Sequence, residues 1–313
     1  MSAQAALIIA QLLNGVQLGL LLFLIAAGLT LIFGVLDFVN LAHGAFVMLG
    51  AFISASLAQL TGSWPAGVAL MLPLLAITGM ALEWSLARPL AGARHHLAQV
   101  LASFGALLAL MALAMLIWGA QGLSVVLPAW LRGQVSFGAG VQLPAYRLLI
   151  IIIGLAVAAA LHLLLHRTRL GMQLRAVAAD GDMAAALGAP VRRLRLFVFA
   201  LGAALAGLAG ALMVPIAEAS LSMAVEYIII AFVIIIIGGL GSLKGALAGA
   251  LLAGMIDTLG RAFLDDALGL IMPLELAETA APALSSMSIY LLMAAILIFR
   301  PAGLFPPARR GRA

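Results

Sequence analysis

The sequence predicts an all-α membrane protein, a polytopic transmembrane helical bundle of about eight to nine spans with broken helices. Only 9% of its 313 residues are charged, whereas a soluble domain carries about 25%. Hydrophobic residues make up 65% of the chain, and the mean hydropathy is +1.24. Uncharged runs long enough to cross a membrane recur along the whole sequence. We therefore expect residues 1–313 to form a single transmembrane domain.

The first half of the chain contains five of the expected spans. The run 7–36 is too long for one straight span of about 20 residues, so we expect Asn14-Gly15 to break it. A polar insertion, Asp37–Gly44, then separates the first span from the second. A long, nearly uncharged loop at 119–146 follows the fourth span. The spans of this half are predicted at 16–36, 45–60, 66–87, 97–118 and 147–165.

A polar island, residues 166–196, divides this half from the second. It cannot lie in hydrocarbon, where a single central Arg or Asp costs about 2.5–3.5 kcal/mol. Further along, residues 261–285 are predicted to form an acidic loop. The spans of the second half are predicted at 196–217, 227–237, 246–260 and 286–299. If one of these runs is re-entrant, the bundle has eight spans instead of nine and the N-terminus changes side.

The basic residues predict the orientation of the bundle. All but three of the sixteen Lys and Arg fall in segments that the positive-inside rule then places in the cytoplasm. These segments are the loop that begins at Arg88, the polar island, Lys244 and the tail 300–313, and the exceptions are Arg132, Arg147 and Arg261. The C-terminus is therefore expected in the cytoplasm. This bias also accounts for the net charge of +5, so we expect no nucleic-acid partner.

The polar island contains a predicted short helix at 178–189, rich in Ala and Leu, which Gly188 and Pro190 end. Acids stand at its start and bases after its end, as the helix dipole favours. The island is longer than a link between adjacent spans needs, which indicates a surface for a cytoplasmic partner. The alternative is an amphipathic segment that lies on anionic lipid. The expected docking residues are Asp180, Asp182, Ala185, Leu187, Gly188, Arg192 and Arg193.

Two glycine-rich interruptions, at 34–50 and 238–254, occur one in each half of the chain. Paired interruptions of apolar helices indicate a transport path through a membrane protein. The alternative is that the small residues allow close helix packing, and that Asn40 and His43 satisfy backbone groups freed where the helix breaks. The candidate path residues are Asn40, His43, Gly44, Gly238, Gly239, Gly241 and Ser242.

The sequence offers no motif for catalysis within this chain. It has no cysteine, and neither a GxxxxGK[ST] phosphate loop nor a Gly-x-Ser-x-Gly nucleophile motif occurs. We therefore expect no catalytic residue, no metal ligand and no cofactor. Charged residues beside the spans are expected to pair with one another, Glu83 with Arg88 and Asp257 with Arg261.

Four stretches occur in an order typical of one family. They are 34–51, which includes Asn40-Leu-Ala-His43-Gly44, then 171–188, 237–246 and 300–305. Together they resemble the membrane permease subunits of branched-chain amino acid ABC importers. The resemblance implies a multi-pass permease of the bacterial inner membrane that moves branched-chain or related small amino acids by alternating access.

The resemblance also implies the partners of the chain. They would be a second permease, identical or homologous, two cytoplasmic ATPase subunits, a periplasmic substrate-binding protein and the surrounding membrane lipid. ATP would be used by the partner subunits, so the docking residues of the polar island would be ATPase-coupling residues.

The sequence does not decide which substrate is transported or what drives its transport. The same family serves urea and short amides. A stand-alone secondary carrier is a further alternative, but such a carrier needs carboxylates inside the membrane, and Asp37 is the main one here. Asp37 also stands where relatives often carry a different residue, so its role is open.

Overall fold

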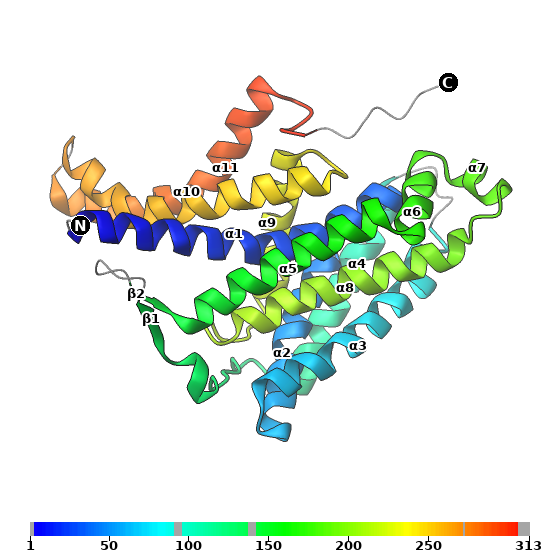
Figure 1. Cartoon of the computed structure of the whole chain (residues 1–313), viewed down its shortest axis with the longest axis horizontal. Helices are drawn as coiled ribbons and strands as arrows, with labels where there is room; N and C mark the ends of the chain where they lie inside the picture. Colours follow the sequence, from blue (N-terminus) through cyan, green and yellow to red (C-terminus); the bar gives the residue numbers. More distant parts are fainter. Residues whose placement is uncertain (1–2, 91–95, 137–141, 272, 306–313) are drawn as a thin grey trace.

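The computed structural model describes residues 3–90, 96–136, 142–271 and 273–305, and these are almost entirely helical (Figure 1), which confirms the all-α prediction. The α-helices are α1 (Ala3–Leu36), α2 (His43–Thr61), α3 (Trp64–Leu82), α4 (His96–Trp118), α5 (Ala145–Arg167), α6 (Arg169–Ala179), α7 (Gly181–Ala186), α8 (Val191–Met213), α9 (Met223–Gly238), α10 (Leu243–Gly269) and α11 (Leu274–Phe299). A π-helix, η1 (Glu83–Ala87), extends α3. The predicted loop at 119–146 contains a 3-10 turn, η2 (Ala129–Leu131), and an antiparallel pair of strands, β1 (Gln134–Ser136) and β2 (Gln142–Pro144).

Eight helices within the described residues are long and apolar enough to cross a membrane. The predicted span at 227–237 is instead the shorter helix α9, which has 16 residues. At 1.5 Å per residue α9 reaches about 24 Å, less than the roughly 30 Å of a hydrocarbon core. The expected eight to nine spans are therefore eight long helices and one short one.

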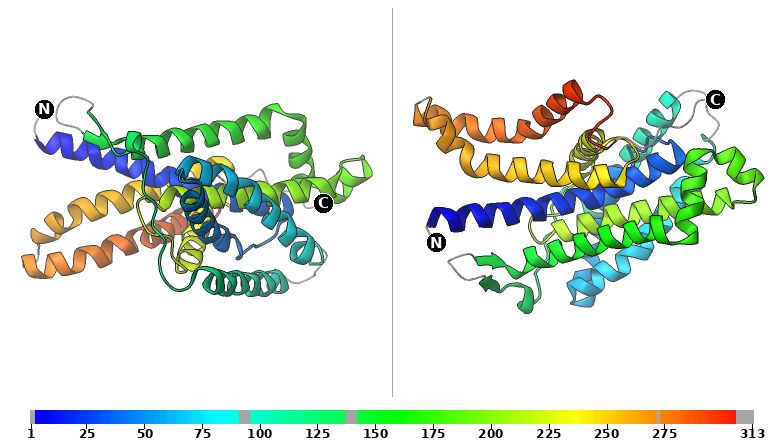
Figure 2. Two further views of the ribbon diagram at one scale, coloured as in Figure 1. Left: turned by 90° about the horizontal axis from the view of Figure 1, so that it is seen from below. Right: turned by 45° about the horizontal axis from the view of Figure 1, so that its top comes forward.

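Helix α1 lies at the centre of the bundle, between α10 on one side and α5 and α8 on the other (Figure 2). Every residue from Leu20 to Ile32 is buried. In the most apolar stretch of α1, 78% of the residues are buried, compared with 17% in α4 and in α5. The core of the protein therefore forms around α1, and the outer helices turn apolar faces outward, as a bilayer requires.

The predicted break at Asn14-Gly15 is wrong, because α1 is one continuous helix of 34 residues. A Cβ at Gly15 would lie 3.0 Å from the Cα of Met255 on α10, so the glycine allows close helix packing. The side-chain oxygen of Asn14 accepts a hydrogen bond from the guanidinium of Arg147 on α5. Both residues thus make contacts between helices and leave the helix of α1 intact.

The predicted acidic loop at 261–285 is also wrong, because most of it is helical. Helix α10 continues to Gly269, and α11 begins at Leu274. Arg261 bonds both carboxylate oxygens of Asp257 one turn earlier, at 2.9 and 3.0 Å, which confirms that expected pair. Charged residues end the apolar run but do not end the helix, because an α-helix satisfies its own backbone in water as well as in lipid.

Glycines bring the backbones of α1, α2 and α8 into direct contact. A Cβ at Gly28 of α1 would lie 2.7 Å from the carbonyl oxygen of Gly202 on α8. A Cβ at Gly50 of α2 would overlap the backbone of Gly207, and one at Gly210 would overlap the carbonyl of Val47. Such contacts drive association in a membrane, where burial of apolar side chains gives little advantage over contact with lipid.

Replacing Gly210 with Ala should destabilise the protein by roughly 1–3 kcal/mol, because the added methyl group forces α8 away from α2. The matched control is Gly105→Ala in α4, where nothing lies within 4 Å of an added Cβ. Thermal unfolding in detergent measures the stability of both variants. If Gly210→Ala melts like Gly105→Ala, these helices do not depend on backbone contact.

Candidate functional site

The first glycine-rich interruption starts α2 deep inside the bundle. Helix α1 ends at Leu36, and Asp37 turns the chain with a positive φ of 51°, a conformation that Asp tolerates better than most residues. The chain then returns toward the centre. The Nε2 atom of His43, the first residue of α2, lies 3.0 Å from the carbonyl oxygen of Ile25, about three turns before the end of α1.

Ser103 of α4 satisfies the unwound backbone at this break. Its hydroxyl accepts a hydrogen bond from the amide of Leu41 at 3.1 Å and lies 3.2 Å from the carbonyl oxygen of Val39. Irregular backbone at membrane depth needs such partners. Sequence analysis missed this residue, because one serine in an apolar span forms no pattern.

Asn40 is completely buried at the break, and within the described residues neither of its side-chain polar atoms has a partner. The Nδ1 atom of His43 is likewise buried and unpartnered there. An unsatisfied buried polar group costs about 1–3 kcal/mol. The break therefore concentrates unused hydrogen-bonding capacity in the protein interior.

Gly44 lets α2 touch α9. A Cβ at this position would overlap the carbonyl oxygen of Ala224 and lie 2.8 Å from the Cβ of Ile228. The close-packing role that the sequence left as an alternative is thus present at Gly44.

The second interruption is the turn between α9 and α10. The stretches 237–246 and 300–305 meet at this turn. Gly239 and Gly241 have positive φ values of 103° and 81°. Ser242 caps α10, its hydroxyl accepting from the amide of Gly245 at 3.1 Å. The amides of Leu304 and Phe305, from the stretch 300–305, donate to the carbonyls of Ile237 and Gly238, both at 2.9 Å.

The structure places the candidate path residues at two locations. Asn40, His43 and Gly44 lie where α2 begins inside the bundle, and Gly238 to Ser242 lie where α9 ends. The two interruptions meet at their edges, where a Cβ at Gly34 would lie 3.2 Å from the Cα of Gly241. Gly241 and Ser242 line a cavity of about 590 Å³, and the first group does not.

The polar island folds into two helices, so the single helix predicted at 178–189 is wrong in its bounds. Asp180 is extended and separates α6 from α7, and its carboxylate accepts from the amide of Met183 at 2.9 Å. Helix α7 ends at Ala186, and Gly188 supplies the predicted stop just after it, with a φ of 89°. The amides of Gly188 and Ala189 donate to the carbonyls of Ala185 and Ala184, at 3.0 and 2.9 Å, the hydrogen bonds of a Schellman motif.

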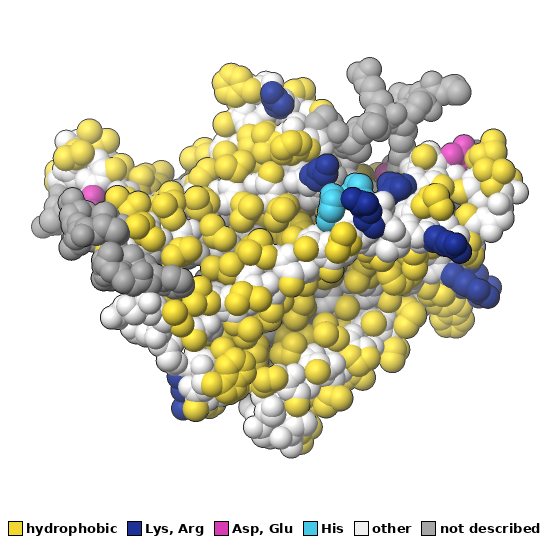
Figure 3. All heavy atoms as spheres, viewed as in Figure 1, with side chains coloured by type: hydrophobic (Ala, Val, Ile, Leu, Met, Phe, Trp, Pro, Cys, Tyr) yellow, Lys and Arg dark blue, Asp and Glu magenta, His cyan; other side chains and the backbone are white. Residues whose placement is uncertain are grey.

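Helix α7 presents a largely apolar surface to solvent. Leu187 is 81% exposed and Met183 58% exposed, while Ala184 faces inward. Arg192 and Arg193 are exposed at the start of α8. Most basic side chains on the face in Figure 3 gather at the end that carries α6 and α7, away from the broad hydrophobic belt. The predicted docking residues are therefore brought together on one projecting element.

Asp37 lies beneath α7. With Asp182, Ala185 and Arg195 it lines a cavity of about 310 Å³ between the end of α1 and the polar island. Asp37 therefore lies at the end of helix α1, facing the polar island, which the sequence alone did not reveal.

A buried carboxylate ties the polar island to α3. Glu83 is completely buried in η1 and accepts from Arg88 at 2.7 Å, which confirms the expected pair. It also binds Arg195 of α8 at 3.2 Å, and Arg195 donates to the carbonyl of Ala87 as well. Sequence spacing could not reveal Arg195 as a partner, because it lies 112 positions from Glu83.

Comparison with known proteins gives a family match across nearly the whole chain. Residues 11–297 match the family model "Branched-chain amino acid transport system / permease component". The high-affinity branched-chain amino acid transport system permease protein BraD of Pseudomonas aeruginosa is 29% identical over 309 residues, 94% of both chains. LivH of Escherichia coli, of the same description, is 29% identical over 84% of this chain and 89% of that protein. A probable LivH of Methanocaldococcus jannaschii is 28% identical over 80% of each.

One solved structure, PsaBC from Streptococcus pneumoniae in complex with Fab, matches at 13% identity over 95% of this chain and 92% of that one. The TM-score of that match is 0.47.

Replacing Glu83 with Gln should destabilise the protein on the order of 3 kcal/mol, because two arginines then lose their buried counter-charge. Thermal unfolding in detergent measures this loss. The control is Glu226→Gln at an exposed position of α9. Equal melting of the two variants would contradict a structural role for the Glu83 pairs.

Proposed function

This chain belongs to the branched-chain amino acid transport permease family, and we propose that it is the membrane-spanning subunit of an ABC importer. It would translocate branched-chain or related small amino acids across the inner membrane, with residues 1–313 acting as one permease domain. Its partners would be a second permease, two cytoplasmic ATPase subunits and a periplasmic substrate-binding protein. The observation that carries the proposal is the family match over residues 11–297, together with the exposed apolar surface of α7.

In this proposal α7 docks into a groove of the ATPase subunit. Large apolar side chains exposed on a water-facing loop, such as Met183 and Leu187, favour a protein partner over solvent. The Asp180 cap and the Schellman motif fix both ends of α7 without help from a partner. The element is therefore preformed, which lowers the entropic cost of docking.

The contacts of α7 suggest how ATPase movement would reach the membrane. A short link, residues 187–190, joins α7 to α8, and Arg195 of α8 is bound to Glu83 at the end of α3. Asp37, at the start of the α1–α2 break, lines the same cavity as Asp182 of α7. Displacement of α7 would thus act on α8, α3 and the break together, which is what a switch between two access states needs.

The α1–α2 break is proposed to border the substrate route. The partnerless amide of Asn40 and the free Nδ1 of His43 would hydrogen-bond the ammonium and carboxylate of a passing amino acid. Gly44 would let α2 and α9 slide at close distance. The turn from Gly238 to Ser242 would form the cytoplasmic end of the route.

The buried acids favour an ABC permease over a secondary carrier. Glu83 and Asp257 both lie in spans, and each is bound to arginine and so is not available for a coupling ion. Asp37 lies at the end of α1. A carrier driven by ions needs carboxylates that can take up and release their ion during each cycle. Whether the substrate is an amino acid, urea or a short amide is decided by binding measurements on the partner binding protein.

Replacing Leu187 with Ser should reduce substrate-stimulated ATP hydrolysis of the assembled complex by roughly tenfold, because docking would lose a buried anchor of about 1.5 kcal/mol or more. Leu60→Ser is the matched control, since Leu60 is 82% exposed at the far end of α2. Gly188→Trp is a weaker test, because the positive φ of Gly188 strains any side chain there. Unchanged stimulation in Leu187→Ser would place the coupling surface elsewhere.

Crosslinking locates the same contact directly. The chain has no cysteine, so Ala185→Cys and Leu187→Cys each introduce a single thiol. We expect both to crosslink to the ATPase subunit, and an impermeant maleimide to label them only from the cytoplasmic side. Labelling from the periplasmic side would overturn the orientation, and labelling from the cytoplasm without a crosslink would overturn the docking alone.

A further inference from the structure

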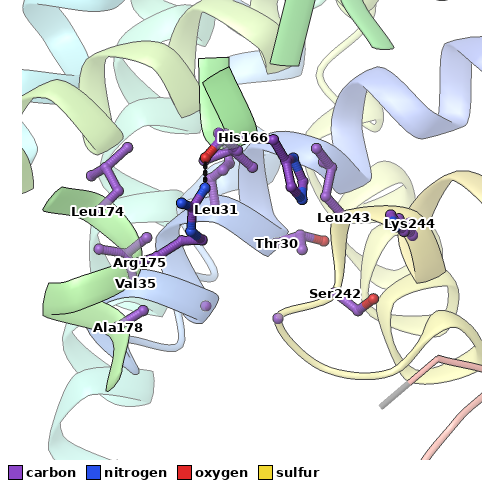
Figure 4. Close-up of a pocket in the computed structure, with 13 residues that line it drawn as sticks. Thr30, Leu31, Val35, His166, Leu174, Arg175, Ala178, Ser242, Leu243 and Lys244 are labelled. Atoms are coloured by element: carbon purple, nitrogen blue, oxygen red, sulfur yellow. Dashed lines mark hydrogen bonds between the residues drawn. The ribbon is translucent and has the colours of Figure 1, made fainter. Parts of the chain in front are cut away.

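A pocket lies between α1, the α5–α6 corner and the α9–α10 turn, and it is here named the α1–α10 pocket (Figure 4). Its volume is about 590 Å³. Three basic side chains line it, His166, Arg175 and Lys244, and none of the described residues that line it is acidic. The pocket therefore attracts anions.

The basic groups of the α1–α10 pocket have few partners of their own. Arg175 donates one N–H to the carbonyl of Leu165, and His166 bonds through Nδ1 to the carbonyl of His162. Lys244 is exposed in the first turn of α10, and no ion pair or hydrogen bond of its ammonium occurs within the described residues. The positive end of the dipole of α10, a helix of 27 residues, adds to the field of Lys244.

A buried hydroxyl on α1 points into this pocket. Thr30 is only 2% exposed, and its Oγ1 has no hydrogen-bond partner within the described residues. In Figure 4 Thr30 lies between Arg175 on one side and Ser242 and Lys244 on the other, with its oxygen toward the α9–α10 turn. A helical threonine commonly bonds the carbonyl one turn back, so this unused donor is available to a ligand.

The rest of the pocket is apolar. Leu31, Val35, Leu174 and Leu243 supply most of the remaining wall. An inorganic anion would leave this wall uncovered. The chemistry fits an anion that is joined to an apolar body.

We propose that the α1–α10 pocket binds the phosphate of an anionic phospholipid. The phosphate would lie between Lys244, Arg175 and the hydroxyl of Thr30, and the acyl chains would follow the apolar wall toward the bilayer. Basic pockets between transmembrane helices on the cytoplasmic side take such head groups. The placement of the pocket on the cytoplasmic side rests on the proposed orientation of the chain. The chemistry by which the pocket would bind a phosphate does not depend on that orientation.

The test uses the full-length chain in nanodiscs of phosphatidylcholine with or without phosphatidylglycerol. Lipids that remain bound after extraction into detergent are quantified by mass spectrometry. We expect the wild-type chain to retain phosphatidylglycerol selectively, and Lys244→Gln to reduce this retention by about fivefold, the effect of one basic side chain beside an anionic head group. Thr30→Val, which keeps the side-chain shape, should also reduce it. Arg169→Gln, exposed on α6 outside the pocket, should retain it like wild type.

Two results would overturn the proposal. One is equal retention by wild type, Lys244→Gln and Thr30→Val. The other is Lys244-dependent binding of sn-glycerol 3-phosphate to lipid-free protein without selective retention of phosphatidylglycerol, which would make the ligand a soluble phosphate. Lipid retention is read without transport or ATP hydrolysis, so the outcome is independent of the proposed function.

Discussion

Backbone-to-backbone contact through glycine is the constraint on which the rest of this structure depends. In a bilayer, apolar side chains gain little by leaving lipid for one another, so helices associate where small residues allow van der Waals contact along the backbone. Gly28, Gly50 and Gly210 bring α1, α2 and α8 that close. The tight core in turn permits an irregular segment to exist inside the bundle, because protein surrounds it and Ser103 bonds its backbone at Val39 and Leu41.

The same closeness links the two ends of the proposed mechanism. Helices in backbone contact leave little free volume between them, so the proposed displacement of α8 would also displace α1 and α2. The Glu83–Arg195 pair extends this linkage to α3, and the cavity beneath α7 brings Asp37 within reach of the polar island. Packed elements thus connect α7, through α8, with α1 and α2, which hold the polar groups of the break.

The sequence predicted what depends on local composition and order. Hydrophobic runs located the spans, the Gly188 stop located the end of α7, and the spacing of Glu83 and Arg88 identified their pair. Prediction from the sequence failed where contacts between distant residues determine the structure. Asn14-Gly15 predicts a break, but Gly15 packs against α10 and Asn14 binds Arg147 of α5. The charges after Arg261 predict a loop but lie on helices. Ser103 and Arg195 could not be found at all, because their partners are distant in the chain.

Uptake by the reconstituted complex tests the central claim most directly. Proteoliposomes containing this permease, its partner permease and the ATPase subunits would be supplied with the binding protein and labelled leucine. We predict uptake that requires ATP on the ATPase side, persists when ion gradients are collapsed, and is lost when this chain is omitted. Uptake driven by an ion gradient without ATP would contradict the account and identify a secondary carrier.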